Sequence, residues 1–226
     1  MIENYSNGDG GRVAEAMQRQ GADCTAVKSY ETTTLPDVRA FDAVAVFGSP
    51  ASCRDLAEHP ALVRVAESMR QCIEIDKPIL GICFGAQLLA HVLGAEVRRN
   101  DPPEYGGYEI SLTPGGAGSP FFAGFPESFM GAQWHEDTFD LPAGATWLAT
   151  SATCRHQAFA FGRQIGTQFH IEATREKVTR WVREYPHLLP GIGKTAEQAM
   201  DELKESLHQQ EALCELFVGN FLRTVG

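Results

Sequence analysis

The chain has 226 residues, of which 43% are hydrophobic and 21% are charged. This composition excludes disordered, collagen-like and coiled-coil classes. The net charge of −10 disfavours nucleic acid as a partner, because a protein that binds phosphate backbones needs a basic surface. No run of about 18 apolar residues occurs, so no membrane span and no membrane partner are expected. The start resembles no secretory signal and the six cysteines lack metal-type spacing, so we expect a cytoplasmic protein without resident metal or cofactor.

The first hundred residues alternate between helical and strand-like patterns. Apolar residues at helical spacing predict helices over 12–20, 60–76 and 84–93. Short apolar runs at 40–47 and 78–82 predict strands that are buried on both faces. This alternation is typical of βαβ units. It therefore predicts an α/β fold with an open, mostly parallel, doubly wound sheet of the flavodoxin-like type.

Beyond residue 94 the pattern changes to short segments separated by turns. These segments predict small antiparallel strands at 108–113, 128–134, 145–149, 157–161 and 165–170. A helix is expected over 174–185, and an amphipathic stretch over 195–222 predicts one C-terminal helix or a helix pair. We therefore divide the chain into a main domain at 1–190 and a helical extension packed on it at 191–226.

The densest chemical signal is the segment from Gly81 to Gly85, with Cys83 at its centre. It lies between a predicted buried strand and a predicted helix. Glycines two positions before and after a nucleophile suit a sharp strand-to-helix turn, since a Cβ there would collide with neighbouring strands. Such a turn lifts the thiol to the ligand-binding edge of the sheet, and the helix N-terminus favours its thiolate form. A structural cysteine beside glycine-rich packing is the minor alternative.

A cysteine nucleophile needs a base, and the chain offers seven histidines. His91 lies about 12 Å along the same helix from Cys83 and is out of reach. His170 ends an apolar strand, and Glu172 follows it by two residues. On an extended chain the two side chains point to the same side, so Glu172 would hold the imidazole in one tautomer. The pair is also compatible with a metal site or an exposed strand end, but no third metal ligand is evident nearby.

Four motifs in order resemble the class I, or triad, glutamine amidotransferases. They are VFGSPAS at 46–52, GICFGAQ at 81–87, QWHEDTFDLP at 133–142 and QFHIEAT at 168–174. The third of these is similar to the segment of free-standing members rather than of domains fused to synthetases. The resemblance covers roughly residues 12–185.

The resemblance implies hydrolysis of the glutamine side-chain amide by a triad. Cys83 would attack the amide carbon and form a γ-glutamyl thioester, His170 would transfer protons, and Glu172 would orient His170. The resemblance also implies an oxyanion hole of backbone N–H groups at Gly48, Ser49 and Phe84. It implies substrate-binding positions at Gln87, Trp134, His135 and Glu136.

Three positions depart from the pattern of that family. Ser49 stands where glycine is usual, and a positive φ there would cost about 1–2 kcal/mol. Ile171 stands where proline is usual but keeps the His-x-Glu spacing. Glu136 stands where glycine is usual, and its charge near the pocket would disfavour free glutamine as the substrate.

Three functions follow from these observations. The first is a glutaminase that releases ammonia for a synthetase subunit on a separate chain, because no P-loop motif for ATP occurs here. The second is a self-contained γ-glutamyl hydrolase or peptidase that acts on a γ-glutamyl conjugate. The third is a non-catalytic regulatory subunit, which the intact triad disfavours.

Overall fold

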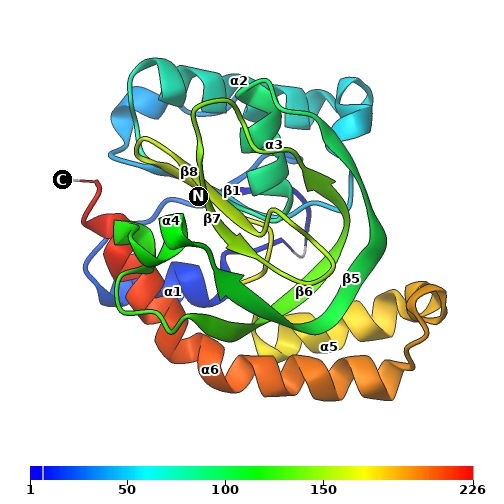
Figure 1. Ribbon diagram of the computed structural model, residues 1–226. Helices are drawn as coiled ribbons and strands as arrows, with labels where there is room; N and C mark the ends of the chain where they lie inside the picture. The colour runs from blue at the N-terminus through cyan, green and yellow to red at the C-terminus, as the bar shows by residue number, and fades with distance from the viewer. Residues whose placement is uncertain (7, 226) are drawn as a thin grey trace.

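The computed structural model describes residues 1–6 and 8–225, and one nine-stranded sheet runs through this part of the chain (Figure 1). The strand order is β2-β1-β3-β4-β9-β8-β7-β5-β6. One half of the sheet is parallel and consists of β2 (Val27–Lys28), β1 (Ile2–Glu3), β3 (Val44–Val46), β4 (Ile79–Ile82) and β9 (Gln164–Thr167). The other half is antiparallel and consists of β8 (Ala158–Phe161), β7 (Thr146–Thr150), β5 (Val97–Leu112) and β6 (Ser128–Phe139). The predicted α/β fold class is confirmed.

The antiparallel strands differ most from the expectation. β5 has 16 residues and β6 has 12, whereas the parallel strands have two to four. Pro102 and Pro103 argue against a continuous strand in the sequence, because proline cannot donate to a strand ladder. In the structure they lie where the register between β5 and β6 shifts. Gly107 in β5 allows close approach to α6 (Ala196–Leu222), because a Cβ would lie 2.5 Å from the carbonyl oxygen of Glu202.

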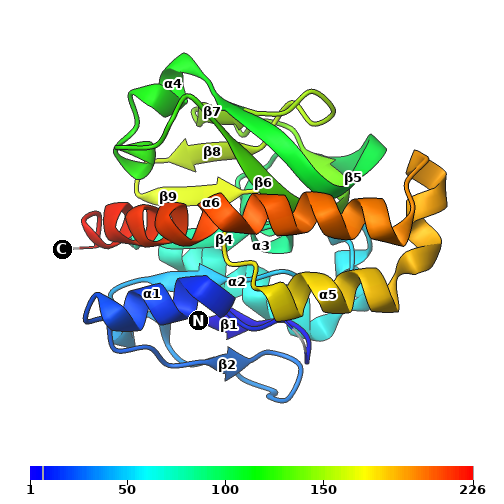
Figure 2. The same ribbon diagram turned by 90° about the horizontal axis from the view of Figure 1, so that it is seen from below.

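Helices cover both faces of the sheet (Figure 2). One face carries α1 (Gly11–Arg19), α5 (Arg175–Glu184) and α6, and the other carries α2 (Pro60–Glu74) and α3 (Phe84–Val92). The short helix α4 (Pro114–Ala117) follows β5. Short 3-10 segments make up η1 (Val38–Ala40), η2 (Cys53–Glu58), η3 (Pro120–Phe122) and η4 (Pro186–Ile192). This layered packing leaves the carboxyl ends of the parallel strands free to form a site.

The C-terminal stretch forms one helix rather than a pair. α6 has 27 residues and begins with a capping box between Thr195 and Gln198. Its apolar residues, including Phe217 and Phe221, share a buried cluster with α1 and the sheet. η4, which joins α5 to α6, is helical and buries Leu189. The division at residue 190 stays a prediction.

In the described part of the chain, no helix is both long enough and apolar enough to cross a bilayer.

Candidate active site

Cys83 lies at the sharp turn between β4 and α3. Its φ of 52° and ψ of −108° are values that residues with a side chain rarely adopt. Its backbone N–H donates to the carbonyl of Thr167 at the end of β9, 2.8 Å away, which anchors the turn to the sheet. The thiol is thereby held at the N-terminus of α3, as the sequence predicts.

The two glycines near Cys83, Gly81 and Gly85, lie where a side chain would not fit. A Cβ on Gly85 would lie 2.0 Å from the carbonyl oxygen of Val46 in β3. A Cβ on Gly81 would lie 2.5 Å from the carbonyl oxygen of Gly85. The collision at Gly85 is with a neighbouring strand, as expected, whereas the collision at Gly81 is with the first turn of the helix.

His170 and Glu172 reach the site from the turn that follows β9. The strand ends at Thr167, and residues 171–172 form a turn, so the expectation of an extended His-x-Glu segment is wrong. The expected contact is nevertheless present, because Nδ1 of His170 donates to Oε1 of Glu172 over 2.8 Å. The N–H of Ala173 donates to the carbonyl of His170 over 3.3 Å and closes this turn.

The pair of His170 and Glu172 is buried, with side-chain exposures of 7% and 2%. Burial alone would lower the pKa of His170, but the charges of Glu172 and Cys83 together raise it well above its usual range. Burial alone would raise the pKa of Glu172, but the charges of His170 and Lys177 hold it below its usual range. Nε2 of His170 has no hydrogen-bond partner among the described residues. His170 is therefore suited to take a proton from a neighbouring thiol.

Lys177 is a buried cation that the sequence analysis did not single out. Its Nζ lies 3.4 Å from Oε1 of Glu172 and donates to the carbonyl of Asp9 over 2.8 Å. Its side chain is 7% exposed. Glu172 thus contacts both His170 and Lys177. Lys177 also connects the loop at Asp9 to this pair. The sequence held no signal for this contact, because a lysine in an amphipathic helix is ordinarily a surface residue.

The predicted oxyanion loop follows β3. Gly48 and Ser49 line the same cleft as Cys83, and neither has a positive φ, so the strain expected at Ser49 is absent. Oγ of Ser49 accepts from the N–H of Ala51 over 3.1 Å and stabilises the loop. Phe84 is the first residue of α3, so its N–H is among the free donors at the helix start. The role of these three N–H groups stays a prediction.

Gln87 lies one turn along α3 and borders the cleft, but its amide nitrogen is engaged by the protein. Nε2 of Gln87 donates to the carbonyl of Asp137 over 3.0 Å and to Oε1 of Gln168 over 3.2 Å. Nε2 of Gln168 in turn lies 3.7 Å from Sγ of Cys83. Contact between Gln87 and a substrate stays a prediction.

His135 borders the cleft, but both of its ring nitrogens are bonded within the protein. Nε2 lies 2.8 Å from Oε2 of Glu104, and Nδ1 lies 2.9 Å from the carbonyl oxygen of Asp137. Glu104 is fully buried, and it also accepts from Ser151 over 2.6 Å and from Gln157 over 2.7 Å. Burial alone would raise the pKa of Glu104, but the bonds from His135 and Ser151 lower it. The side chain of His135 therefore fixes the backbone of β6, and contact between His135 and a substrate stays a prediction.

One cluster of three candidate metal ligands occurs among residues 1–6 and 8–225. It consists of Glu104, His135 and Cys154, whose ligand atoms lie within 4.8 Å of one another. Hydrogen bonds already occupy these atoms, since Sγ of Cys154 lies 3.2 Å from Oγ1 of Thr138 and His135 is bonded to Glu104. The donor set thus favours a buried polar network, and the absence of a metal stays a prediction.

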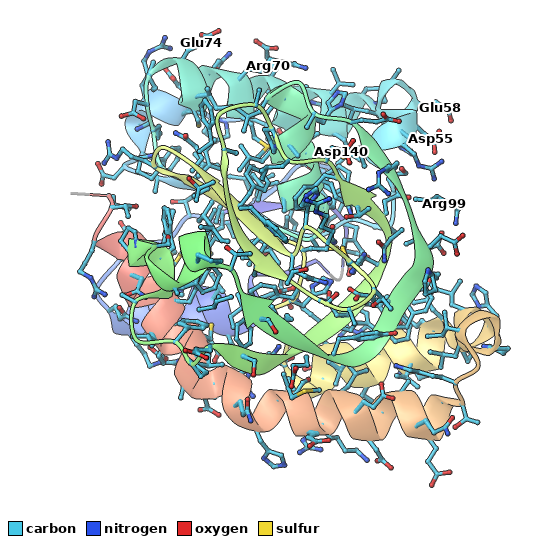
Figure 3. All side chains as sticks on the ribbon, in the orientation of Figure 1. Asp55, Glu58, Arg70, Glu74, Arg99 and Asp140 are labelled. Carbon is cyan, nitrogen blue, oxygen red and sulfur yellow. The ribbon has the colours of Figure 1, made fainter. Side chains whose placement is uncertain are left out.

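Glu136 does not present a lone charge to the cleft. Its Oε2 lies 2.8 Å from Nη1 of Arg99, and its Oε1 accepts from the hydroxyl of Tyr105 over 3.0 Å. Arg99 projects from the same rim of the molecule as Asp55 of η2 (Figure 3). The negative charge expected from the sequence is therefore offset by Arg99, which the sequence analysis did not foresee.

Aromatic rings form one wall of the cleft. Trp134 stacks on Trp181 of α5 with ring centroids 5.9 Å apart, and Trp181 lies 4.6 Å from the ring of His170. The predicted position Trp134 is thus near His170, but it reaches His170 through Trp181, which was not predicted. These rings shield His170 from water on that side.

Asp137 is a further residue at the cleft that the sequence analysis missed. Its side chain is 8% exposed. Oδ2 accepts from the hydroxyl of Ser52 and from Nε of Arg54, whereas Oδ1 is buried and has no partner among the described residues. A buried carboxylate oxygen without a partner beside a cleft makes Asp137 a candidate for contact with a positively charged ligand group.

The cleft that joins these groups has a volume of about 710 Å³. It contains Cys83 and His170, together with Ser49, Asp137 and Glu136. This volume lies within the range of pockets that hold whole small molecules.

Residues 6–183 match a protein-family model that is described as glutamine amidotransferase class-I. The chain is 33% identical over 180 residues to a glutamine amidotransferase-like protein of Salmonella typhimurium, covering 77% of this chain and 75% of that protein. It is 32% identical over 155 residues to a glutamine-hydrolysing GMP synthase subunit of Saccharolobus solfataricus, covering 67% and 77% respectively. It spans only 29% of the GMP synthase of Thermomicrobium roseum, at 35% identity.

Solved structures have the same fold. A glutamine amidotransferase of Thermotoga maritima superposes with a TM-score of 0.84 at 26% identity, covering 99% of this chain and 96% of the other. A glutamine amidotransferase of Methylobacillus flagellatus superposes with a TM-score of 0.89 at 22% identity, covering 99% and 93%.

Proposed function

The chain belongs to the class I glutamine amidotransferase family of enzymes, as its four motifs indicated, and on this premise we propose that it hydrolyses the side-chain amide of glutamine through Cys83, His170 and Glu172. One observation carries the proposal. Cys83, at its sharp turn, lines the same cleft as His170, and His170 is buried and hydrogen-bonded to Glu172. An activated thiol requires a base that is itself oriented by a third group, and the bonded pair of His170 and Glu172 beside Cys83 supports this role.

The reaction proceeds in two halves. The thiolate of Cys83 attacks the amide carbon, the C–N bond breaks, and the ammonia leaves with a proton from His170. Water then attacks the thioester carbon while His170 takes a proton from it, and glutamate is released as the C–S bond breaks. Glu172 holds the imidazolium in both halves. Backbone N–H groups of Ser49 and Phe84 stabilise the oxyanion, at about 3 kcal/mol per donor.

The cleft also supplies a receptor for the amino-acid end of the substrate. Oδ1 of Asp137 is buried and unpaired among the described residues, and it is suited to accept from the α-ammonium group of glutamine. The guanidinium of Arg99 at the mouth is suited to the α-carboxylate, since its partner Glu136 occupies only part of it.

The ammonia acceptor is proposed to be a synthetase on a separate chain. A relative of similar length is named as a subunit of GMP synthase, which supports this arrangement. The test measures ammonia release from glutamine by the wild type and by Cys83→Ser and His170→Ala, with and without candidate synthetases. Loss of activity in both variants, with stimulation of the wild type by one partner, supports the proposal. Equal ammonia release by the wild type and Cys83→Ser would refute it.

A self-contained γ-glutamyl hydrolase is the second candidate. The volume of about 710 Å³ favours it, because this is room for a conjugate as well as for a single amino acid. Glutamine and a γ-glutamyl anilide, compared as substrates of the isolated chain, distinguish the two. A much higher kcat/KM for the anilide, without any partner, favours the hydrolase.

A further inference from the structure

Gln168 is a fully buried polar residue beside the nucleophile, in the segment between β9 and His170. Its side-chain amide lies between two partners, Gln87 on one side and the sulfur of Cys83 on the other. A buried amide without bonds would destabilise the fold, so its two ends must each suit the group they face.

The hydrogen bonds fix which end of this amide faces Cys83. The backbone carbonyl of Asp137 can only accept, so the Gln87 group that lies 3.0 Å from it must be the NH₂ group. That same NH₂ group lies 3.2 Å from Gln168, and the Gln168 atom facing it must therefore be the oxygen. The remaining end of Gln168, at 3.7 Å from the sulfur, is then the NH₂ donor.

The chain of bonds is anchored at its far end. Nδ1 of His135 also lies 2.9 Å from the carbonyl oxygen of Asp137, and His135 is bonded through Nε2 to the buried Glu104. Because these groups are buried and bonded, the orientation of Gln87 and Gln168 is set before any substrate arrives.

We propose that Gln168 is a further catalytic residue, whose amide N–H donates to the sulfur of Cys83 and stabilises its anionic form. This role rests on the proposed thiol-dependent hydrolysis. The donor acts twice. It stabilises the thiolate before attack, and it stabilises the sulfur when the C–S bond of the thioester breaks and the electron pair returns to sulfur. In the second step water supplies the hydroxyl group to the carbonyl carbon and its proton passes to His170.

Other groups around Cys83 do not duplicate this donor. Among the titratable groups, His170, Tyr5 and Cys53 lie near enough to the thiol for its charge to raise their pKa values. His170 must give up its proton to the leaving ammonia, whereas the amide of Gln168 keeps its protons throughout the cycle. Gln168 therefore provides stabilisation that does not change with the protonation of His170.

The test follows the rate at which iodoacetamide alkylates Cys83 as the pH is raised, because this rate reports the thiolate fraction without requiring any turnover. The variants are Gln168→Met, which removes the donor at similar volume, and Gln168→Glu, which replaces it with an acceptor. The matched control is Gln164→Met. Gln164 is a buried glutamine of β9 whose amide donates to the carbonyl of Lys77, away from the cleft.

The midpoint of the alkylation profile is expected to rise by about one pH unit in Gln168→Met, as for the loss of one hydrogen bond to a charged group. It is expected to rise further in Gln168→Glu and to stay in place in Gln164→Met. A smaller rise of the midpoint is expected in Gln87→Leu, because this variant removes the hydrogen bond that orients the amide of Gln168. It replaces the Gln168 variants in the test if those do not fold.

An unchanged midpoint in the folded variants, or an equal shift in Gln164→Met, would overturn the role of Gln168. Neither result touches the proposed hydrolysis, which is judged separately by ammonia release from the wild type and Cys83→Ser.

Discussion

The ammonium group of Lys177 lies 3.4 Å from the same carboxylate oxygen of Glu172 that accepts from His170. Glu172 therefore has two cationic partners. The second one comes from α5 and also holds the loop at Asp9. The buried charge of Glu172 is therefore stabilised from outside the His-x-Glu pair as well as from within it.

Lys177→Met is expected to destabilise the protein by about 2 kcal/mol at neutral pH, because it removes a hydrogen bond to a buried charge. The pKa of Glu172 is held below its ordinary value of 4.5, so its contribution to stability is present above that pH and is lost as the pH falls. The difference between the wild type and Lys177→Met should therefore shrink below pH 4.5. Urea unfolding across this range measures it.

The control for Lys177→Met is Lys204→Met, which removes a lysine of α6 that pairs with Asp201 at the surface. Its effect should be small at every pH. A gap between the wild type and Lys177→Met that stays constant from neutral pH to acid would contradict the assigned contact.

Asp137→Asn is expected to raise KM for glutamine about tenfold while changing kcat much less. The reason is that the proposed bond between Oδ1 and the α-ammonium group contributes to binding and does not touch the reacting amide. Asp140→Asn is the matched control, since Asp140 is a half-exposed carboxylate near the same strand end that pairs with Arg98. A fall in kcat at constant KM would argue that Asp137 acts on the chemistry instead.

Glu136→Gln is expected to lower KM for glutamine about threefold at low salt, because it leaves Arg99 without its carboxylate partner and free for the substrate. Arg99→Met should abolish this gain when the two changes are combined. The gain should also shrink as salt rises, since both groups are partly exposed. If Glu136→Gln acts equally with and without Arg99, the ion pair is irrelevant to binding.

Gly85→Ala is expected to destabilise the fold by about 3 kcal/mol, at the upper end for overpacking, because the new Cβ meets backbone of β3 rather than a movable side chain. Gly191→Ala provides the control, since nothing lies within 4 Å of a Cβ there. Thermal unfolding compares the two variants, and equal Tm values would refute the packing argument.

Cys83 is expected to be the first of the six thiols to react with iodoacetamide at neutral pH, because it lies at a helix N-terminus beside His170. Burial raises the pKa of Cys72 to about 11 and those of Cys154 and Cys214 to about 12. Cys24 is the competitor, since it is only half-buried. Peptide mapping decides the order, and labelling of Cys24 before Cys83 would contradict it.

The sequence by itself determined the sharp turn at Cys83 and the contact between His170 and Glu172, because both are local. The glycines that permit the turn lie two residues from Cys83, and the partner of His170 lies two residues away. Residues so close in sequence have few alternative arrangements. The contact between His170 and Glu172 is therefore present even though their segment forms a turn and not a strand. The fold class followed for a similar reason, since the alternation of helices and strands is a property of neighbouring residues.

Only the tertiary structure decided what surrounds Cys83, His170 and Glu172. Arg99 and Glu136 meet because β5 and β6 pair in a register that opposes Arg99 to Asp137. Gln87 and Gln168 meet because β4 and β9 are neighbours in the sheet, although 81 positions separate the two residues. Strand order and register depend on packing across the whole sheet, and a shift of one residue would point the side chain of Arg99 or Glu136 to the opposite face. No local pattern carries that information, so these partners could not be found from the sequence.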